Sequence, residues 1–215
     1  MGPLAALQAK EYAENGLLGV VRTGEALEAG PFLAAVDASG SMAGRPELIA
    51  KGVAMGLAQA ARGEDRTYAL CQFSTSIDSE VAQADGWAAH LNWAQSFTGG
   101  GTSFSAVLEW AIAKIRESDL RENADLLIIT DGEAPVYPKF AQAWRDLAAE
   151  TGARLIFVAV GVNPQRSQLA ALADRNHRLK LLRFCDDKIP LLLLAIRFDQ
   201  LLTQCNFEFG ALCIA

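Results

Sequence analysis

The stretch Asp37-Ala38-Ser39-Gly40-Ser41 places three oxygen-bearing side chains two residues apart around a glycine. It directly follows an apolar run, residues 32–36, that is typical of a buried strand. A strand that ends at an acid and turns through Ser-Gly-Ser delivers oxygen atoms to one point at its carboxyl end. Open parallel sheets bind their ligands at that edge. The stretch therefore predicts a site made of oxygen ligands, although Asp and Ser could also cap a following helix there.

Two more oxygen-bearing residues occur where a strand ends or a helix begins. Thr102 follows three consecutive glycines, residues 99–101, and Asp131 follows the apolar run 124–130. Two carboxylates and three hydroxyls, without His or Cys, form a set of hard oxygen ligands. Such a set suits Mg²⁺, Mn²⁺ or Ca²⁺ rather than zinc or copper. Because Mg²⁺ prefers six oxygens, at least one position would stay open, and a carboxylate from a partner protein could fill it.

The elements that must position these residues alternate along the chain. We expect helices to begin at Pro46 and near residues 87, 104, 140, 169 and 189, the last of them ending near 204. The expected strands are residues 32–36, 66–74, 77–82, 124–130, 154–160 and 179–185. This alternation predicts an α/β protein with a mostly parallel central sheet covered on both faces, and with residues 77–82 as one short antiparallel edge strand.

Composition and charge narrow the function classes. The 215 residues carry a net charge of −6 with scattered acids, which argues against nucleic acid as a partner. The longest apolar run, residues 189–196, is too short for a membrane span. None of the four cysteines forms a C-x-x-C pair, so we expect free thiols and a cytoplasmic protein, with Cys71 in the core. The expected divisions are a leader or linker (1–30), one domain (31–204) and a tail (205–215).

Residues 31–200 resemble von Willebrand factor A (VWA) domains. Asp37-Ala38-Ser39-Gly40-Ser41 matches their D-x-S-x-S motif, Gly101-Thr102 their distant threonine, and Thr130-Asp131-Gly132 their distant aspartate. The resemblance implies a three-layer α/β/α Rossmann-like fold and a metal-ion-dependent adhesion site that usually holds Mg²⁺. It further implies that Ser39, Ser41 and Thr102 bind the metal directly, and that Asp37 and Asp131 bind it directly or through water.

Two further segments are most similar to the bacterial intracellular group of VWA proteins. They are Gly30-Pro31-Phe32, which leads into the motif, and Phe97-Thr98-Gly99-Gly100-Gly101-Thr102. Proteins of that group are often paired with MoxR-type AAA+ ATPases. The resemblance therefore implies an adaptor or co-chaperone of such an ATPase.

An enzyme is the alternative interpretation. Asp37 could act as the nucleophile of a metal-dependent phosphatase or hydrolase, but position 39 is Ser and so lacks the second acid of a D-x-D-x-T motif. Ser39 and Ser41 lack a G-x-S-x-G elbow and an evident His partner. We therefore predict a binding module rather than an enzyme, with a metal bound by Asp37, Ser39, Ser41, Thr102 and Asp131.

The remaining candidates each have two interpretations. His90 and His177 are far from the cluster in sequence and are expected to be structural. Glu133 is expected to be a solvated loop acid or to lie at the rim of the site. The four tryptophans are expected to be core or groove aromatics, with Trp93 and Phe97 flanking the site as the alternative.

Overall fold

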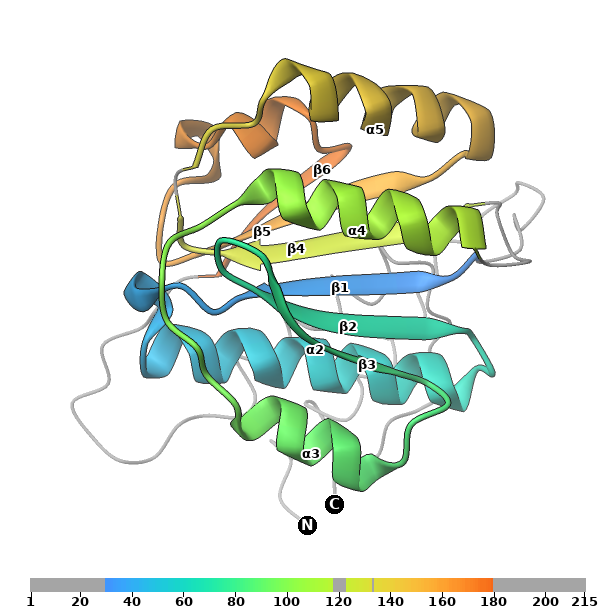
Figure 1. The fold of residues 1–215 in the computed structure, drawn as a ribbon, viewed down its shortest axis with the longest axis vertical. Coiled ribbons are helices and arrows are strands. Elements are labelled where there is room, and N and C mark those ends of the chain that lie inside the picture. The colour runs from blue at the N-terminus through green and yellow to red at the C-terminus, as the bar shows by residue number, and fades with distance from the viewer. Residues whose placement is uncertain (1–29, 118–122, 133, 180–215) are drawn as a thin grey trace, which may run out of the picture.

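The computed structural model describes residues 30–117, 123–132 and 134–179. A six-stranded sheet in the order β3-β2-β1-β4-β5-β6 crosses the molecule (Figure 1). All neighbours pair in parallel except β3, which is antiparallel to β2. The prediction of a mostly parallel sheet with one antiparallel edge strand is confirmed. The strands are β1 Phe32–Asp37, β2 Tyr68–Phe73, β3 Ile77–Ala82, β4 Asp125–Thr130, β5 Arg154–Val160 and β6 Arg175–Leu179.

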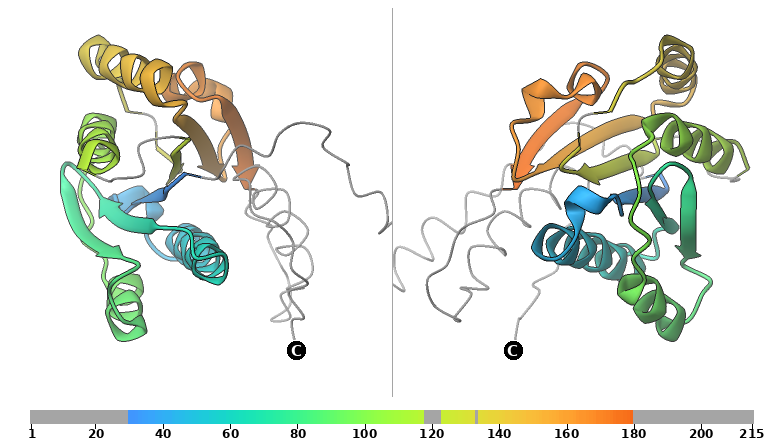
Figure 2. Two further views of the ribbon diagram at one scale, coloured as in Figure 1. Left: turned by 90° about the vertical axis from the view of Figure 1, so that its right-hand side faces the viewer. Right: turned by 60° about the vertical axis from the view of Figure 1, so that its left-hand side comes forward.

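Helices cover both faces of this sheet. The α-helices α4 and α5 lie on one face and α2 on the other, which gives the predicted three-layer α/β/α arrangement (Figures 1 and 2). The helices are α2 Arg45–Gly63, α3 Trp87–Gln95, α4 Phe104–Glu117 and α5 Pro138–Thr151, with 3₁₀ turns η1 Gly40–Met42, η2 Pro164–Arg166 and η3 Gln168–Ala171. Among the described helices, none has the length and apolar character needed to cross a bilayer.

Strand β1, the first strand in sequence, is an unbroken apolar run because it is buried on both faces of the sheet. Phe32 and Val36 of β1 pack in the core layer that includes α2, and Leu33 and Ala35 pack in the layer that includes α4. All six residues of β1 are buried. A strand covered on both faces has no polar face, so its sequence shows no alternation.

One detail of the prediction is wrong, and one strand was not predicted. The expected helix near residue 169 is two 3₁₀ turns, η2 and η3, because Asn163 and Ser167 each accept a backbone N–H and begin a new short turn. Strand β6 was not predicted, because its exposed Arg175 and Arg178 carry no apolar signal. It ends at Leu179, where the expected strand 179–185 begins. In α3, Leu91 is 55% exposed, whereas His90 and Trp93 face the protein.

Several expected elements lie outside the described residues. These are the leader up to residue 29, strand residues 180–185, the helix 189–204 and the tail 205–215. The domain bounds 31–204 therefore stay a prediction.

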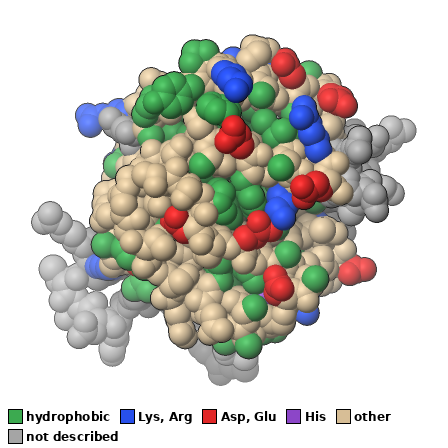
Figure 3. Space-filling model, viewed as in Figure 1, with side chains coloured by type: hydrophobic (Ala, Val, Ile, Leu, Met, Phe, Trp, Pro, Cys, Tyr) green, Lys and Arg blue, Asp and Glu red, His purple; other side chains and the backbone are tan. Residues whose placement is uncertain are grey.

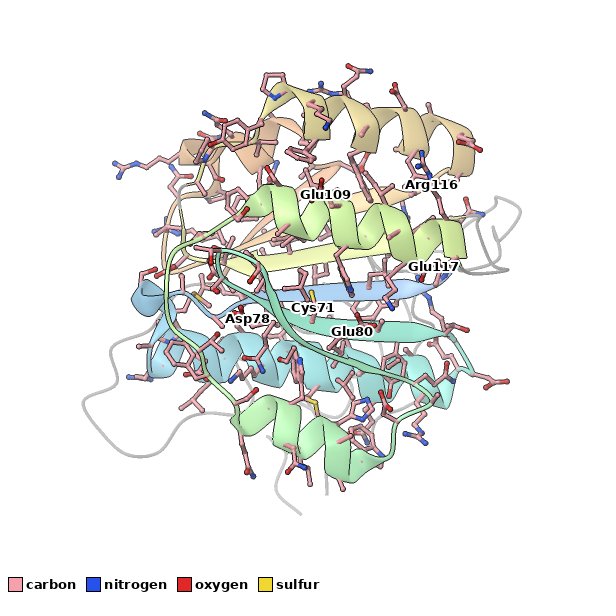
Figure 4. All side chains as sticks on the ribbon, in the orientation of Figure 1. Cys71, Asp78, Glu80, Glu109, Arg116 and Glu117 are labelled. Carbon is pink, nitrogen blue, oxygen red and sulfur yellow. The ribbon has the colours of Figure 1, made fainter. Side chains whose placement is uncertain are left out.

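The edge strand β3 is tied to helix α4 by polar side chains. Trp110 Nε1 donates a 2.9 Å hydrogen bond to Glu80 Oε2, and Lys114 Nζ lies 2.7 Å from Glu80 Oε1. Figure 4 shows Glu80 on β3 beside α4, with the buried free thiol of Cys71 on the neighbouring β2. These contacts fix the position of the hairpin β2–β3, whose turn reaches the end of the sheet where β1 stops.

A buried ion cluster holds the opposite end of the sheet together. Asp125, the fully buried first residue of β4, lies 2.6 Å from Arg66 Nη2 and 2.5 Å from Arg154 Nη2. The Arg66 contact is a hydrogen bond, whereas the geometry of the Arg154 contact makes it an ion pair only. Arg66 Nε also donates to the Gly30 carbonyl at 2.6 Å and so fixes the entry to β1.

We predict that Asp125→Asn lowers the free energy of unfolding by about 3–5 kcal/mol, because it leaves the buried Arg66 charge without its counter-ion. Chemical denaturation monitored by circular dichroism measures this. Lys114→Met is the control, since its pair with Glu80 is a third exposed and should contribute less than about 1 kcal/mol. Equal losses in the two variants would contradict the prediction.

Candidate metal centre

Asp37 ends β1 at the edge where the parallel strands finish, here called the carboxyl edge. Its side chain is fully buried. The Ser39 backbone N–H donates to Asp37 Oδ1 at 2.8 Å, and the Thr130 hydroxyl donates to Asp37 Oδ2. The strand register explains the second contact: Val36 pairs with Ile129, so Asp37 and Thr130 follow side by side. Both carboxylate oxygens are thereby held in fixed directions.

The two serines of the motif connect Asp37 to the end of β4. The Ser39 and Ser41 hydroxyl oxygens are 3.2 Å apart, and Ser41 Oγ donates to Asp131 Oδ1 at 2.9 Å. Residues 94 positions apart in the chain, Asp37 and Asp131, thus belong to one hydrogen-bonded group. In Figure 1 the turn η1 lies at the left-hand end of β1, beside the loop that joins α3 to α4.

Thr102 completes the group, and Gly132 leaves the space for it. A Cβ on Gly132 would lie 3.3 Å from Thr102 Oγ1, 3.3 Å from Asp37 Oδ2 and 3.1 Å from Thr130 Oγ1. Three side-chain oxygens therefore converge on one point, and any side chain there would be in tight contact with all three. The structure brings together all five residues predicted from the sequence: Asp37, Ser39, Ser41, Thr102 and Asp131.

The electrostatics of this group favour a cation. Burial raises the pKa of the Asp37 carboxyl above its usual range, and the Asp131 carboxylate raises it further. The hydrogen bonds from Thr130 and Ser39 act in the opposite direction and lower this pKa. Two carboxyl groups in one partly buried place repel each other unless a positive charge lies between them. The donor set fits a hard divalent cation such as Mg²⁺.

The loop 96–103, here called the Gly-rich loop, is held firmly against the motif. Gly99 and Gly100 have φ angles of 71° and 113°, which only glycine adopts readily. The Gly40 N–H donates to the Gly100 carbonyl at 3.0 Å, and the Ser103 N–H donates to the Ser74 carbonyl at 2.7 Å. Thr102 therefore reaches the site from a loop whose backbone is fixed on both sides.

Sequence reasoning missed the residues that hold this loop. Lys51 of α2 is only 3% exposed, and its ammonium donates to the Ser96 carbonyl and pairs with Glu47. Gln72 Nε2 donates to Ser96 Oγ at 2.8 Å. The Thr98 hydroxyl donates to Asp78 Oδ2 at 2.7 Å. The signal available was a lysine on the buried face of an amphipathic helix, but it does not reveal a partner 45 residues away.

The other candidates are placed differently. His90 is fully buried, where its Nε2 lies 2.9 Å from the Tyr68 hydroxyl and its Nδ1 3.1 Å from the Gly86 carbonyl, so its role is structural as expected. Trp93 is 4% exposed and belongs to the core, whereas Phe97 is 37% exposed. Glu133 lies outside the described residues. Over the described part of the chain, no three His, Cys, Asp or Glu side chains gather as a metal site, so this centre depends on hydroxyl groups.

Comparison with known sequences gives partial relatives. No protein-family model matches the chain. It is 32% identical to the uncharacterized protein MJ0811 of Methanocaldococcus jannaschii over 148 residues, 67% of this chain and 34% of that protein. It is 32% identical to the regulatory protein ViaA of Photorhabdus laumondii over 103 residues, 47% of this chain and 21% of that protein. The chain therefore spans about a third or less of these relatives.

Comparison with solved structures decides the fold. A von Willebrand factor type A protein from Catenulispora acidiphila superposes with a TM-score of 0.60 at 14% identity, covering 82% of this chain and 42% of that one. The VWA domain of SpRpn10 superposes with a TM-score of 0.56 at 11% identity, covering 86% of this chain and all of that one. The chain has a VWA fold. BatB from Bacteroides thetaiotaomicron is a further example, with a TM-score of 0.57 at 15% identity, covering 83% of this chain and all of that one.

In this VWA fold we predict that Asp37→Asn stabilises the metal-depleted protein by roughly 0.5–2 kcal/mol at neutral pH. The reason is that burial raises the pKa of the folded-state carboxyl above its unfolded value, so the ionised group opposes folding. As pH rises from the ordinary carboxyl range through the raised pKa, the wild-type Asp37 ionises and the free energy of unfolding of the wild-type protein should fall. The free energy of unfolding of Asp37→Asn should not show this fall.

Urea denaturation of metal-depleted protein across a pH series measures the difference. Asp125→Asn is the matched control, because Asp125 is equally buried but paired with arginines, so its loss should destabilise. Destabilisation of the same size by Asp37→Asn would contradict the prediction.

Proposed function

We propose that this chain is a magnesium-dependent protein-interaction module. The observation that carries the proposal is the convergence of five oxygen-bearing side chains from three loops at the carboxyl edge of the sheet. Ser39, Ser41 and Thr102 would hold the cation directly, and Asp37 and Asp131 would hold it directly or through water. The bound cation would supply a positive charge that accepts one further oxygen ligand.

The partner would supply that ligand as an aspartate or glutamate carboxylate. Asp37 is buried with both oxygens hydrogen-bonded, and Asp131 accepts from Ser41, so neither can fill a position on the solvent side. If the two carboxylates bind through water, the direct ligands of this chain are neutral hydroxyls, and the cation keeps positive charge toward the solvent. An anionic group from another protein fits that charge. Mn²⁺ and Ca²⁺ take the same class of ligands and are the alternative occupants.

Several features favour binding over catalysis. A nucleophilic Asp37 would need a free, accessible oxygen, whereas its side chain is fully buried and both oxygens accept hydrogen bonds. The two histidines of the described region, His90 and His177, lie on α3 and β6 and not among the site residues. The metal-dependent phosphatase or hydrolase is thus the less favoured reading.

The partner would be a protein whose activity this chain regulates. The similarity to a protein named regulatory protein ViaA supports a role in controlling another protein. The likeness of Gly30-Pro31-Phe32 and of residues 97–102 to VWA proteins paired with MoxR-type AAA+ ATPases makes such an ATPase the candidate partner. An adaptor of this kind would work in the cytoplasm.

Titration of the metal-depleted protein with MgCl₂ in a calorimeter tests the metal site. The wild-type chain should bind one equivalent, and Thr102→Ala and Asp131→Asn should each weaken binding by about 10–100-fold or more. Parallel titrations with MnCl₂ and CaCl₂ rank the alternative ions. Glu109→Gln, an exposed acid on α4, is the control and should bind like the wild type. Unchanged Mg²⁺ binding in Thr102→Ala would overturn the proposed site.

A further inference from the structure

Large apolar side chains that remain exposed are unevenly placed in the described part of the chain. The five are Leu48, Trp87, Leu91, Phe97 and Tyr137. Leu48 lies in the first turn of α2, Phe97 in the Gly-rich loop, and Tyr137 at the N-cap of α5. All three segments begin or pass at the carboxyl edge, next to the motif, whereas Trp87 and Leu91 lie on α3. Three of the five therefore belong to segments at the same edge of the sheet as the candidate metal centre.

Leu48 and Phe97 both lie close to Lys51. Leu48 is three residues before Lys51 on α2, and its side chain is 68% exposed where that of the lysine is buried. The Lys51 ammonium lies 5.9 Å from the centre of the Phe97 ring. Leu48 and Phe97 therefore share Lys51 as a neighbour, and Tyr137 lies in the segment that follows Asp131.

Phe97 is held in place before any partner arrives. The residue before it, Ser96, accepts from Lys51 and from Gln72, and the residue after it, Thr98, donates to Asp78. A fixed aromatic ring loses little conformational entropy on binding and is a typical binding hot spot. Phe97 is 37% exposed, so part of its side chain is available to a partner.

Exposed bases occur in segments at the carboxyl edge. Arg45, Lys139 and Arg166 lie in the segments that follow β1, β4 and β5 there. The opposite edge carries exposed charges of both signs, such as Arg116 and Glu117 at the end of α4. The three exposed bases at the carboxyl edge favour an acidic partner.

Figure 3 shows the same face of the molecule as Figure 1. Hydrophobic side chains lie on its left-hand side, above and below a region that is mostly backbone and uncharged side chains but includes an acidic side chain. That side is the carboxyl edge of Figure 1.

We propose that the partner presents its metal-binding carboxylate within a segment whose neighbouring residues are large and apolar. One such neighbour packs on Leu48 and Phe97, and one on the other side of the acid packs on Tyr137. This inference rests on the proposed magnesium-dependent function and adds which acidic segments the site selects. The apolar contacts supply affinity and selectivity, and Arg45, Lys139 and Arg166 accelerate association with acidic segments.

Selection from a library of random peptides displayed on phage tests the inference with the full 215-residue chain in Mg²⁺. The recovered peptides should carry an aspartate or glutamate with large apolar residues within about three positions on each side, a spacing that an extended peptide covers in roughly 10 Å. Their binding should be lost in EDTA and in Asp37→Asn. Recovery of acidic peptides with no apolar preference would overturn the inference and leave the proposed function intact. Failure to recover any magnesium-dependent acidic peptide would overturn both.

Affinities of one selected peptide for point variants localise the contact. Phe97→Ala should weaken binding about tenfold or more, and Leu48→Ala and Tyr137→Ala several-fold. Leu91→Ala is the matched control for Leu48→Ala, and Trp87→Ala is the matched control for Phe97→Ala. Trp87 is 38% exposed, like Phe97, and both control residues lie on α3, away from the motif. The controls should change affinity less than about twofold. The inference would be overturned if the control variants weakened peptide binding as much as Phe97→Ala and Leu48→Ala do. It would also be overturned if Phe97→Ala and Leu48→Ala kept Mg²⁺ binding and left the peptide affinity unchanged.

Discussion

A buried carboxylate with no basic partner is the constraint on which the site depends. Asp37 is fully buried at the end of β1, and the described groups that act on its pKa are hydroxyls, an amide and the carboxylate of Asp131. This contrasts with Asp125 at the other end of the sheet, which two arginines neutralise. The same sheet thus holds one buried carboxylate whose charge arginines neutralise, Asp125, and one without a cationic partner among the described groups, Asp37. A buried carboxylate without such a partner at the edge where ligands bind is typical of a functional site.

The parallel register brings the parts of this site together. Because Val36 pairs with Ile129, β1 and β4 end at the same level, and Asp37 meets Thr130 directly. The segments that follow those strands lead into α2 and α5, so the loops of both units open on one edge. The Gly-rich loop reaches the same edge from α3 and is fastened to η1 through Gly40 and Gly100. Long-range proximity therefore follows from topology.

Much of this arrangement could be predicted from local patterns. The apolar runs 32–36 and 124–130 end at acids, and the rule for parallel sheets places those acids at one edge. The roles of Thr130 and Gly132 could not be predicted in the same way. They depend on a side-chain hydrogen bond between strands and on a contact distance near 3 Å. Lys51 was missed because its partner, the Ser96 carbonyl, is 45 residues away.

The face of α3 shows a different limit. A helix near residue 87 could be predicted, but not that a histidine and a tryptophan take its inner face while Leu91 is exposed. His90 can do so because the Tyr68 hydroxyl and the Gly86 carbonyl satisfy both ring nitrogens. The edge strand β6 was not predicted, since its exposed arginines carry no apolar signal. For α3, the partners available in three dimensions decide the inner face, and a sequence window does not contain them.

Gly132 limits which substitutions this sequence can accept at the candidate site. Its missing side chain is the opening onto which Thr102, Asp37 and Thr130 converge, and a single added methyl group would press against all three oxygens. The Gly132 backbone has no left-handed torsion that would itself require glycine. The contacts at 3.1–3.3 Å, rather than the backbone, therefore limit which residue can occupy this position, because the neighbouring oxygens would have to move by a few tenths of an ångström. A one-codon change at this position would act on the geometry of the candidate site before it acts on the backbone.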